Sequence, residues 1–126
     1  MPTQERRPVV VLVDEEPSIR QAVARLLQEA SFDVHEAADP DEAARILEKE
    51  PAADALVVDA HVPGRIDGFE LAAKARGRLP GLAVVMMSGH SDDTSGPVPE
   101  GGEFIAKAYL TDRLVPTLNR MIGRLS

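Results

Sequence analysis

The chain has 126 residues, a length that suits one globular domain, and we take residues 1–126 as a single domain. Its formal net charge of −7 argues against direct binding to nucleic acid, which usually requires a basic face. There is no cysteine, and no apolar stretch approaches the roughly 20 residues of a membrane span. The first residues, MPTQERRP, lack the apolar core of a signal peptide. We therefore expect a cytoplasmic protein that binds neither nucleic acid nor membrane.

Apolar strand-like runs alternate with segments in which apolar residues recur at helical spacing. In chain order the predicted elements are strand 8–14, helix 18–30, strand 32–37, helix 39–50, strand 55–59, helix 68–79, strand 81–88, strand 103–107 and helix 111–125. Strand 32–37 alternates apolar and polar residues, which is typical of a half-exposed edge strand, whereas strands 8–14, 55–59 and 81–88 are continuous apolar runs and strand 103–107 is short.

Local signals mark several helix ends. Pro17 suits the first turn of the first helix. Asp39 is the expected N-cap of the second helix, with Pro40 at its first position and Glu42 completing a capping box. In the last helix, Pro116 lies near the predicted start and is expected to delay or kink it.

Strand–helix alternation at this spacing predicts an α/β fold with a parallel sheet that is covered on both faces. Five strands with an alternating second strand suit the doubly wound, flavodoxin-like strand order 2-1-3-4-5. Residues 91–102 break the alternation, because this segment contains two prolines and three glycines and has no helical period. We expect at most one helical turn near residues 91–95 and then an irregular loop, so the fourth crossover helix is short or missing.

In an open parallel sheet, the site lies at the carboxyl ends of the strands, near the point where the strand order reverses. The residues found at these ends are Asp14, Glu15 and Glu16 after the first strand, Asp59 ending the third, Ser88 ending the fourth and Lys107 ending the fifth. The first and third strands flank the reversal, so we expect at least three carboxylates to converge there.

Clustered carboxylates repel one another unless a cation lies among them. A divalent ion such as Mg²⁺ would offset the repulsion, and Lys107 would add a second positive charge. This arrangement suits phosphoryl transfer, in which catalysis is mostly positioning and charge neutralisation, and the carboxylate of Asp59 could itself be the nucleophile. A single aspartate after an apolar strand is more often a plain turn residue, and the first-strand acids could serve only as a helix N-terminal charge cluster. The conjunction of all four strand ends favours the functional interpretation.

This constellation resembles the receiver domain of two-component response regulators over nearly the whole chain. The matching segments are VLVDEEPSIR for the acidic pair, VVDAHVPGRIDGFEL for the phosphoryl acceptor, VVMMSGH for the switch hydroxyl and FIAKAY for the lysine. The resemblance implies a phosphorylatable signalling switch rather than an enzyme acting on other substrates. Its expected partners are a sensor histidine kinase or histidine phosphotransfer protein and a downstream effector protein.

The resemblance also assigns roles to single residues. Asp59 would be the phosphorylation site, and Lys107 and Ser88 would assist the reaction. Asp14 and Glu15 would bind Mg²⁺ together with Asp59 and the backbone carbonyl of His61. Ser88 and Phe104 would form the switch pair. His61 and His90 occupy positions that are linked to phosphoryl lifetime in the family, with two solvent-exposed loop histidines as the alternative.

The chain departs from the family pattern at several positions. Glu15 stands where the family most often has aspartate, and Ala108 stands where proline usually follows the lysine. A cis bond before a residue other than proline costs roughly 2.5–4 kcal/mol, so we predict a trans Lys107–Ala108 bond. These departures and the irregular fourth crossover keep open a second hypothesis, a pseudo-receiver that acts as a phosphorylation-independent interaction module.

Overall fold

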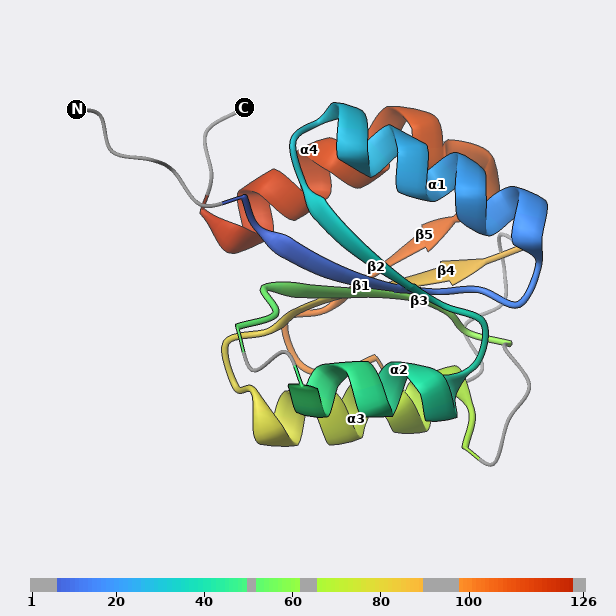
Figure 1. The fold of residues 1–126 in the computed structure, drawn as a ribbon. Helices are drawn as coiled ribbons and strands as arrows, with labels where there is room; N and C mark the ends of the chain where they lie inside the picture. The colour runs from blue at the N-terminus through green and yellow to red at the C-terminus, as the bar shows by residue number, and fades with distance from the viewer. Residues whose placement is uncertain (1–6, 50–51, 62–65, 90–97, 124–126) are drawn as a thin grey trace.

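The computed structural model describes residues 7–49, 52–61, 66–89 and 98–123. Five parallel strands form one sheet in the order β2-β1-β3-β4-β5, which confirms the predicted topology (Figure 1). The strands are β1 (Val9–Val13), β2 (Asp33–Ala37), β3 (Ala55–Asp59), β4 (Ala83–Ser88) and β5 (Glu103–Ala106).

Helices cover both faces of the sheet. They are α1 (Pro17–Glu29), α2 (Pro40–Lys49), α3 (Gly68–Arg78) and α4 (Leu110–Ile122), and a short 3-10 segment, η1 (Lys107–Tyr109), leads into α4. Helices α1 and α4 lie on one face, and α2 and α3 lie on the other (Figure 1). Over the described residues, no helix is long and apolar enough to cross a membrane.

The core explains why the central strands read as continuous apolar runs. Every residue of β1, β3 and β4 is buried, because successive side chains on each strand enter opposite helical layers. Val11 and Leu56 belong to the cluster under α2 and α3, whereas Val10 and Val57 belong to the cluster under α1 and α4. The edge strand β2 is partly exposed, as its alternating pattern predicts.

The predicted cap of α2 is present with one change of partner. The N–H of Glu42 donates to Oδ1 of Asp39 at 2.8 Å, as expected of an N-cap. Oε1 of Glu42 accepts from the N–H of Ala38, one residue earlier than a capping box requires. A complete capping box occurs instead at the start of α3, where Asp67 and Glu70 each accept from the other's backbone N–H.

The last helix contradicts one of the two effects expected of Pro116, the delayed start. Helix α4 begins at Leu110, directly after η1, so Pro116 lies inside the helix and does not delay its start. A proline there removes the single backbone hydrogen bond that its N–H would have made, and the rest of the helix is retained. The helix ends earlier than predicted, because Gly123 adopts a left-handed conformation (φ 76°) that closes its C-terminus.

The connection between β4 and β5 is not helical where it is described. Residues 98–102 form a turn in which the N–H of Gly102 donates to the carbonyl of Pro99 at 2.8 Å. Gly101 has a φ of 82° in this turn, a conformation that favours glycine. Val98 packs against the core beneath α2 and α3. The expectation for residues 91–97, including a single helical turn near 91–95, falls outside the described residues.

Candidate functional site

The register of the sheet places two aspartates side by side. Strands β1 and β3 are neighbours, and Val13 lies opposite Val58. The next residue on each strand is an aspartate, Asp14 after β1 and Asp59 at the end of β3. Asp14 is fully buried, and Asp59 is 8% exposed. The strand ends therefore hold two carboxylates at the point where the strand order reverses.

Lys107 joins the two carboxylates. Its Nζ donates a hydrogen bond to Oδ2 of Asp59 at 2.8 Å and lies 3.0 Å from Oδ2 of Asp14. Lys107 is the first residue after β5, so the ammonium reaches the two aspartates across the end of β4. One ammonium thus faces two carboxylates, which leaves the group with a net negative charge.

This arrangement raises the pKa of Lys107 above its ordinary value of 10.5. Burial of the side chain by itself lowers the pKa, because it penalises the charged ammonium. The hydrogen bond to Asp59 and the attraction of both carboxylates outweigh burial. Lys107 is therefore a cation at every pH near neutrality.

The remaining oxygens of the two aspartates differ in their surroundings. Oδ1 of Asp59 accepts from the backbone N–H of His61 at 2.9 Å, and Oδ1 of Asp14 accepts from the N–H of Glu16 at 2.9 Å. Oδ2 of Asp14 is enclosed, and the ammonium of Lys107 at 3.0 Å is the polar contact that the described residues give it. A buried carboxylate oxygen of this kind is suited to a further cation.

The expected third carboxylate does not join the pair. Glu15 is exposed, and Glu16 serves as the N-cap of α1, where it accepts from the N–H of Ser18. No group of three or more histidine, cysteine or acidic side chains is close enough to hold a metal ion across residues 7–49, 52–61, 66–89 and 98–123. The cap explains part of the difference, because it turns Glu16 back onto its own helix.

Gly68, which the sequence analysis did not single out, holds the backbone of Asp59 in place. A Cβ at this position would lie 2.5 Å from the carbonyl oxygen of Asp59 and 3.2 Å from Cα of Ala60. The first residue of α3 therefore packs directly on the end of β3, at a distance that only glycine allows. The Asp67-Gly68 pair before an apolar helical pattern is the sequence signal that could have indicated this contact.

The other predicted residues lie at or near the same edge. Ser88 is fully buried at the end of β4, opposite Ala106, which precedes Lys107. Phe104 is partly buried on β5 and packs against the core under α2 and α3. His61 is exposed beside Asp59, and its N–H contacts that carboxylate. His90 lies outside the described residues.

The peptide bond after Lys107 is trans, as predicted, because the described residues contain no cis bond. Ala108 lies within η1 rather than in an extended loop. The lysine nevertheless reaches both aspartates, so a trans bond is compatible with its contacts to the two carboxylates.

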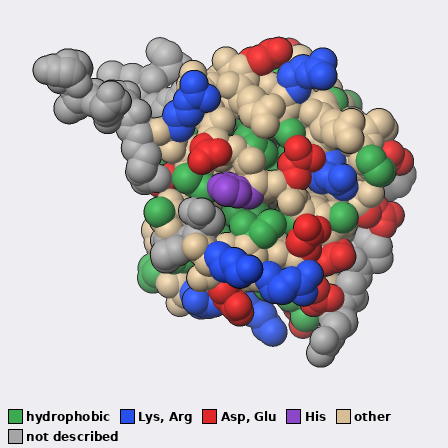
Figure 2. All heavy atoms as spheres, viewed as in Figure 1, with side chains coloured by type: hydrophobic (Ala, Val, Ile, Leu, Met, Phe, Trp, Pro, Cys, Tyr) green, Lys and Arg blue, Asp and Glu red, His purple; other side chains and the backbone are tan. Residues whose placement is uncertain are grey.

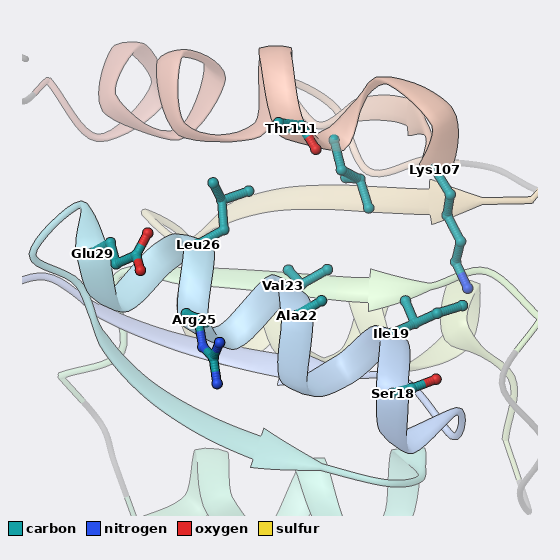
Figure 3. Close-up of a pocket in the computed structure, with 10 residues that line it drawn as sticks. Ser18, Ile19, Ala22, Val23, Arg25, Leu26, Glu29, Lys107 and Thr111 are labelled. Carbon is teal, nitrogen blue, oxygen red and sulfur yellow. The ribbon is translucent and has the colours of Figure 1, made fainter.

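A groove of about 520 Å³ lies between α1 and α4 and opens beside the site. Figure 3 shows Lys107 at one end of it, next to Ile19 and Ser18. Ile19 is one of the exposed large apolar side chains of the chain, at 36% exposure. Elsewhere, on the face shown in Figure 2, acidic and basic side chains are interspersed and neither sign dominates.

A buried aspartate at the central strand end, a partner aspartate and a lysine on a 2-1-3-4-5 sheet define a receiver-type domain. The family model described as the response regulator receiver domain matches residues 10–118. The chain belongs to this family.

Named relatives agree with this assignment. The nitrogen assimilation regulatory protein NtrX of Azorhizobium caulinodans is 33% identical over 121 residues, covering 92% of this chain and 26% of that protein. The sensor kinase CckA of Brucella abortus is 29% identical over 118 residues, covering 91% of this chain and 12% of that kinase. The crystal structure of the NtrX receiver domain from Brucella abortus superposes with a TM-score of 0.77 at 28% identity, covering 90% of this chain and 98% of that one.

The chain spans about a quarter of the length of the first curated relatives that it matches. The family is a signalling family of two-component systems. The activities of the longer relatives belong to those proteins.

Proposed function

We propose that this domain is a phosphorylation-dependent switch in which Asp59 accepts a phosphoryl group from a sensor histidine kinase or a histidine phosphotransfer protein. The observation that carries the proposal is the position of the Asp59 carboxylate. It lies at the end of a buried strand, 8% exposed, with one oxygen held by Lys107 and the other by the His61 N–H. A carboxylate that is fixed in place and not wholly enclosed is suited to act as a nucleophile.

In the proposed step, an oxygen of Asp59 attacks phosphorus and forms a new P–O bond. The bond between phosphorus and the donor's imidazole nitrogen breaks, and its electron pair stays on that nitrogen. Lys107 neutralises charge that develops on the transferred group, since its ammonium is already positioned beside Asp59. Later attack by water on the acyl phosphate would release inorganic phosphate and restore the carboxylate.

The donor set fits Mg²⁺. This ion prefers oxygen ligands and typically uses one or two carboxylates together with water and phosphate oxygens. Oδ2 of Asp14 is a buried oxygen whose polar contact within the described part of the chain is the Lys107 ammonium, and Asp59 lies beside it. We assign the site to Asp14 and Asp59. The backbone carbonyl of His61 would add a ligand, and Glu15, which lies outside the pair in this structure, would turn toward the ion to add another. When bound, the ion would supply a counter-charge to the carboxylates and the phosphoryl oxygens.

Intact mass spectrometry after incubation with acetyl phosphate tests the proposal. We expect the mass of one phosphoryl group to be added when Mg²⁺ is present, and expect no addition with a chelator, in Asp59→Asn or in Asp14→Ala. The same addition in Asp59→Asn would place the phosphate elsewhere and overturn the assignment. The partly buried Asp41→Asn variant on α2, remote from the strand ends, is the matched control and should behave like the wild type.

A pseudo-receiver is the second candidate, and two observations favour it. The Lys107–Ala108 bond lacks the proline of the family pattern, and the described end of the fourth crossover is a turn rather than a helix. The two candidates differ in their response to the phosphoryl donor. A switch shows changed amide resonances at Ser88 and Phe104 after phosphorylation, whereas a phosphorylation-independent module binds its partner with the same affinity in both states.

The proposed partners follow from the same site. A phosphoryl donor protein must reach the strand ends, and the groove between α1 and α4 opens there beside Lys107. The exposed Ile19 supplies an apolar contact at this end of the groove. The proposal includes a cytoplasmic setting and no catalytic activity beyond the domain's own phosphorylation and dephosphorylation.

A further inference from the structure

Asp14 is fixed by backbone contacts on both sides. Its N–H donates to the carbonyl of Ala37 on β2 at 3.1 Å, and its own carbonyl accepts from Nη1 of Arg20 at 2.8 Å. Its Oδ1 accepts from the N–H of Glu16 at 2.9 Å. Three of the four polar atoms of Asp14 are thus held, and the fourth, Oδ2, faces Lys107. The direction of this oxygen depends on the contacts of the other three.

The side chain of Arg20 is in turn held by a second contact, with Glu36 on β2. Its Nε donates to Oε1 of Glu36 on β2 at 3.1 Å, and its side chain is only 17% exposed. The guanidinium therefore links the first turns of α1, the edge strand β2 and the carbonyl that follows β1. A planar guanidinium that is held at two nitrogens has little freedom to move.

We propose that Arg20, supported by Glu36, is a positioning residue of the cation site: it locks the Asp14–Glu15 peptide so that Asp14 Oδ2 faces Lys107, which also contacts Asp59. This inference rests on the proposed Mg²⁺-dependent function. Arg20 does not contact Asp59 in any bond that the structure shows, and its hydrogen bond goes to the Asp14 carbonyl rather than to the carboxylate. Its effect is therefore exerted through another residue, like that of other outer partners of metal ligands.

The charge of Arg20 and its hydrogen bond to the Asp14 carbonyl predict opposite changes in Mg²⁺ affinity when Arg20 is replaced by glutamine. A guanidinium close to an acidic site repels a divalent cation, so loss of its charge alone would tighten Mg²⁺ binding. Loss of its positioning contact would loosen the Asp14–Glu15 peptide and weaken Mg²⁺ binding. The direction of the change in Arg20→Gln therefore separates the two explanations.

The experiment is an Mg²⁺ titration of the full chain by calorimetry, with the phosphorylation rate by acetyl phosphate measured at saturating Mg²⁺. We expect Arg20→Gln to weaken Mg²⁺ binding by about 10-fold, the lower end of the range for outer partners of metal ligands. The rate at saturating Mg²⁺ should change much less, because Arg20 touches no reacting atom. Arg20→Lys should recover part of the affinity through one hydrogen bond, and Glu36→Gln should weaken binding less than Arg20→Gln.

The exposed Arg25→Gln on the same helix is the matched control, and thermal melting checks that each variant is folded. Unchanged or tighter Mg²⁺ binding by folded Arg20→Gln, beside normal binding by the wild type, would overturn the positioning role and leave the proposed function standing. Failure of the wild type itself to bind Mg²⁺ would overturn the proposed function. The two failures are therefore distinguishable.

Discussion

At the scale of single residues, the site contains more negative charge than its lysine can neutralise. Asp14 and Asp59 are both buried, and one ammonium contacts both of them at 2.8–3.0 Å. Such a group is stable without a further cation only while the lysine is charged. The stability of the metal-free domain should therefore follow the protonation of Lys107.

We predict that Lys107→Met lowers the free energy of unfolding by about 1.5–3 kcal/mol at pH 8, the range for hydrogen bonds to charged groups. The folded state raises the pKa of Lys107 above 10.5, so its contribution is fully present below that pH. The contribution is lost as the pH rises through the raised pKa. Denaturant unfolding in the presence of a chelator should give a smaller difference in the free energy of unfolding between the wild type and Lys107→Met at pH 11.5 than at pH 8.

The exposed Lys74→Met on α3 serves as the control, because it removes a lysine that contacts neither aspartate. A wild-type advantage over Lys107→Met that stays constant between the two pH values would show that the ammonium does not stabilise the pair through its charge.

At the scale of elements, the geometry of Asp59 depends on the close approach of α3 to the end of β3. We predict that Gly68→Ala destabilises the domain by about 1–3 kcal/mol, the usual cost of forcing extra volume into a packed site. The added methyl group would lie 2.5 Å from the Asp59 carbonyl oxygen and must push α3 or β3 aside. The phosphorylation rate of Gly68→Ala should fall as well, because the displaced strand end carries Asp59.

Gly77→Ala is the matched control on the same helix, where a Cβ would meet nothing within 4 Å. It should raise stability by up to about 1 kcal/mol through helix propensity alone. Equal effects of the two substitutions in thermal melting would contradict the role assigned to the Gly68 contact.

The described end of the connection between β4 and β5 contains a turn and no helix. Another contact must therefore hold the start of β5 in place. Arg76 on α3 provides such a link. Its Nε donates to the carbonyl of Leu82 before β4, and its Nη1 donates to the carbonyl of Glu100 in the turn before β5. The Arg76 side chain thus connects α3 to the segments that precede β4 and β5.

We predict that Arg76→Gln destabilises the domain by about 1.5–3 kcal/mol, because the loss leaves two carbonyl groups without their charged donor. Amide hydrogen exchange should accelerate most at Gly102 and along β5. Arg78→Gln, which removes only an exposed 3.8 Å pair with Glu48, should leave exchange in β5 unchanged. Uniform acceleration across the whole sheet would indicate a general loss of stability instead of a local link.

At the scale of the whole molecule, the strand order and both helical layers could be predicted from the sequence. Continuous burial of β1, β3 and β4 makes the apolar runs unambiguous, and a parallel sheet with alternating helices admits few topologies. The pairing of Asp14 with Asp59 follows from the same topology, because Asp14 directly follows the buried strand β1 and Asp59 ends the buried strand β3.

The details that the sequence did not predict depend on tertiary contacts. Helix α4 continues through Pro116 because its packed face, including Leu114 and Leu118, stabilises it beyond its local propensity. Arg20 lies six residues from the carbonyl that it binds, and Arg76 bridges two loops, spacings for which no local pattern exists. Glu15 and Glu16 read as parts of one acidic cluster, although the cap of α1 takes one of them.

We expect Asp59, and neither Asp14 nor Glu15, to carry the phosphoryl group. Borohydride reduction converts an aspartyl phosphate to homoserine, so peptide mapping after treatment with acetyl phosphate and Mg²⁺ identifies the acceptor directly. We predict homoserine at position 59 in the wild type, and none in samples treated without the phosphoryl donor. Homoserine at position 14, the corresponding reduction product at Glu15, or no reduced residue at all would contradict it.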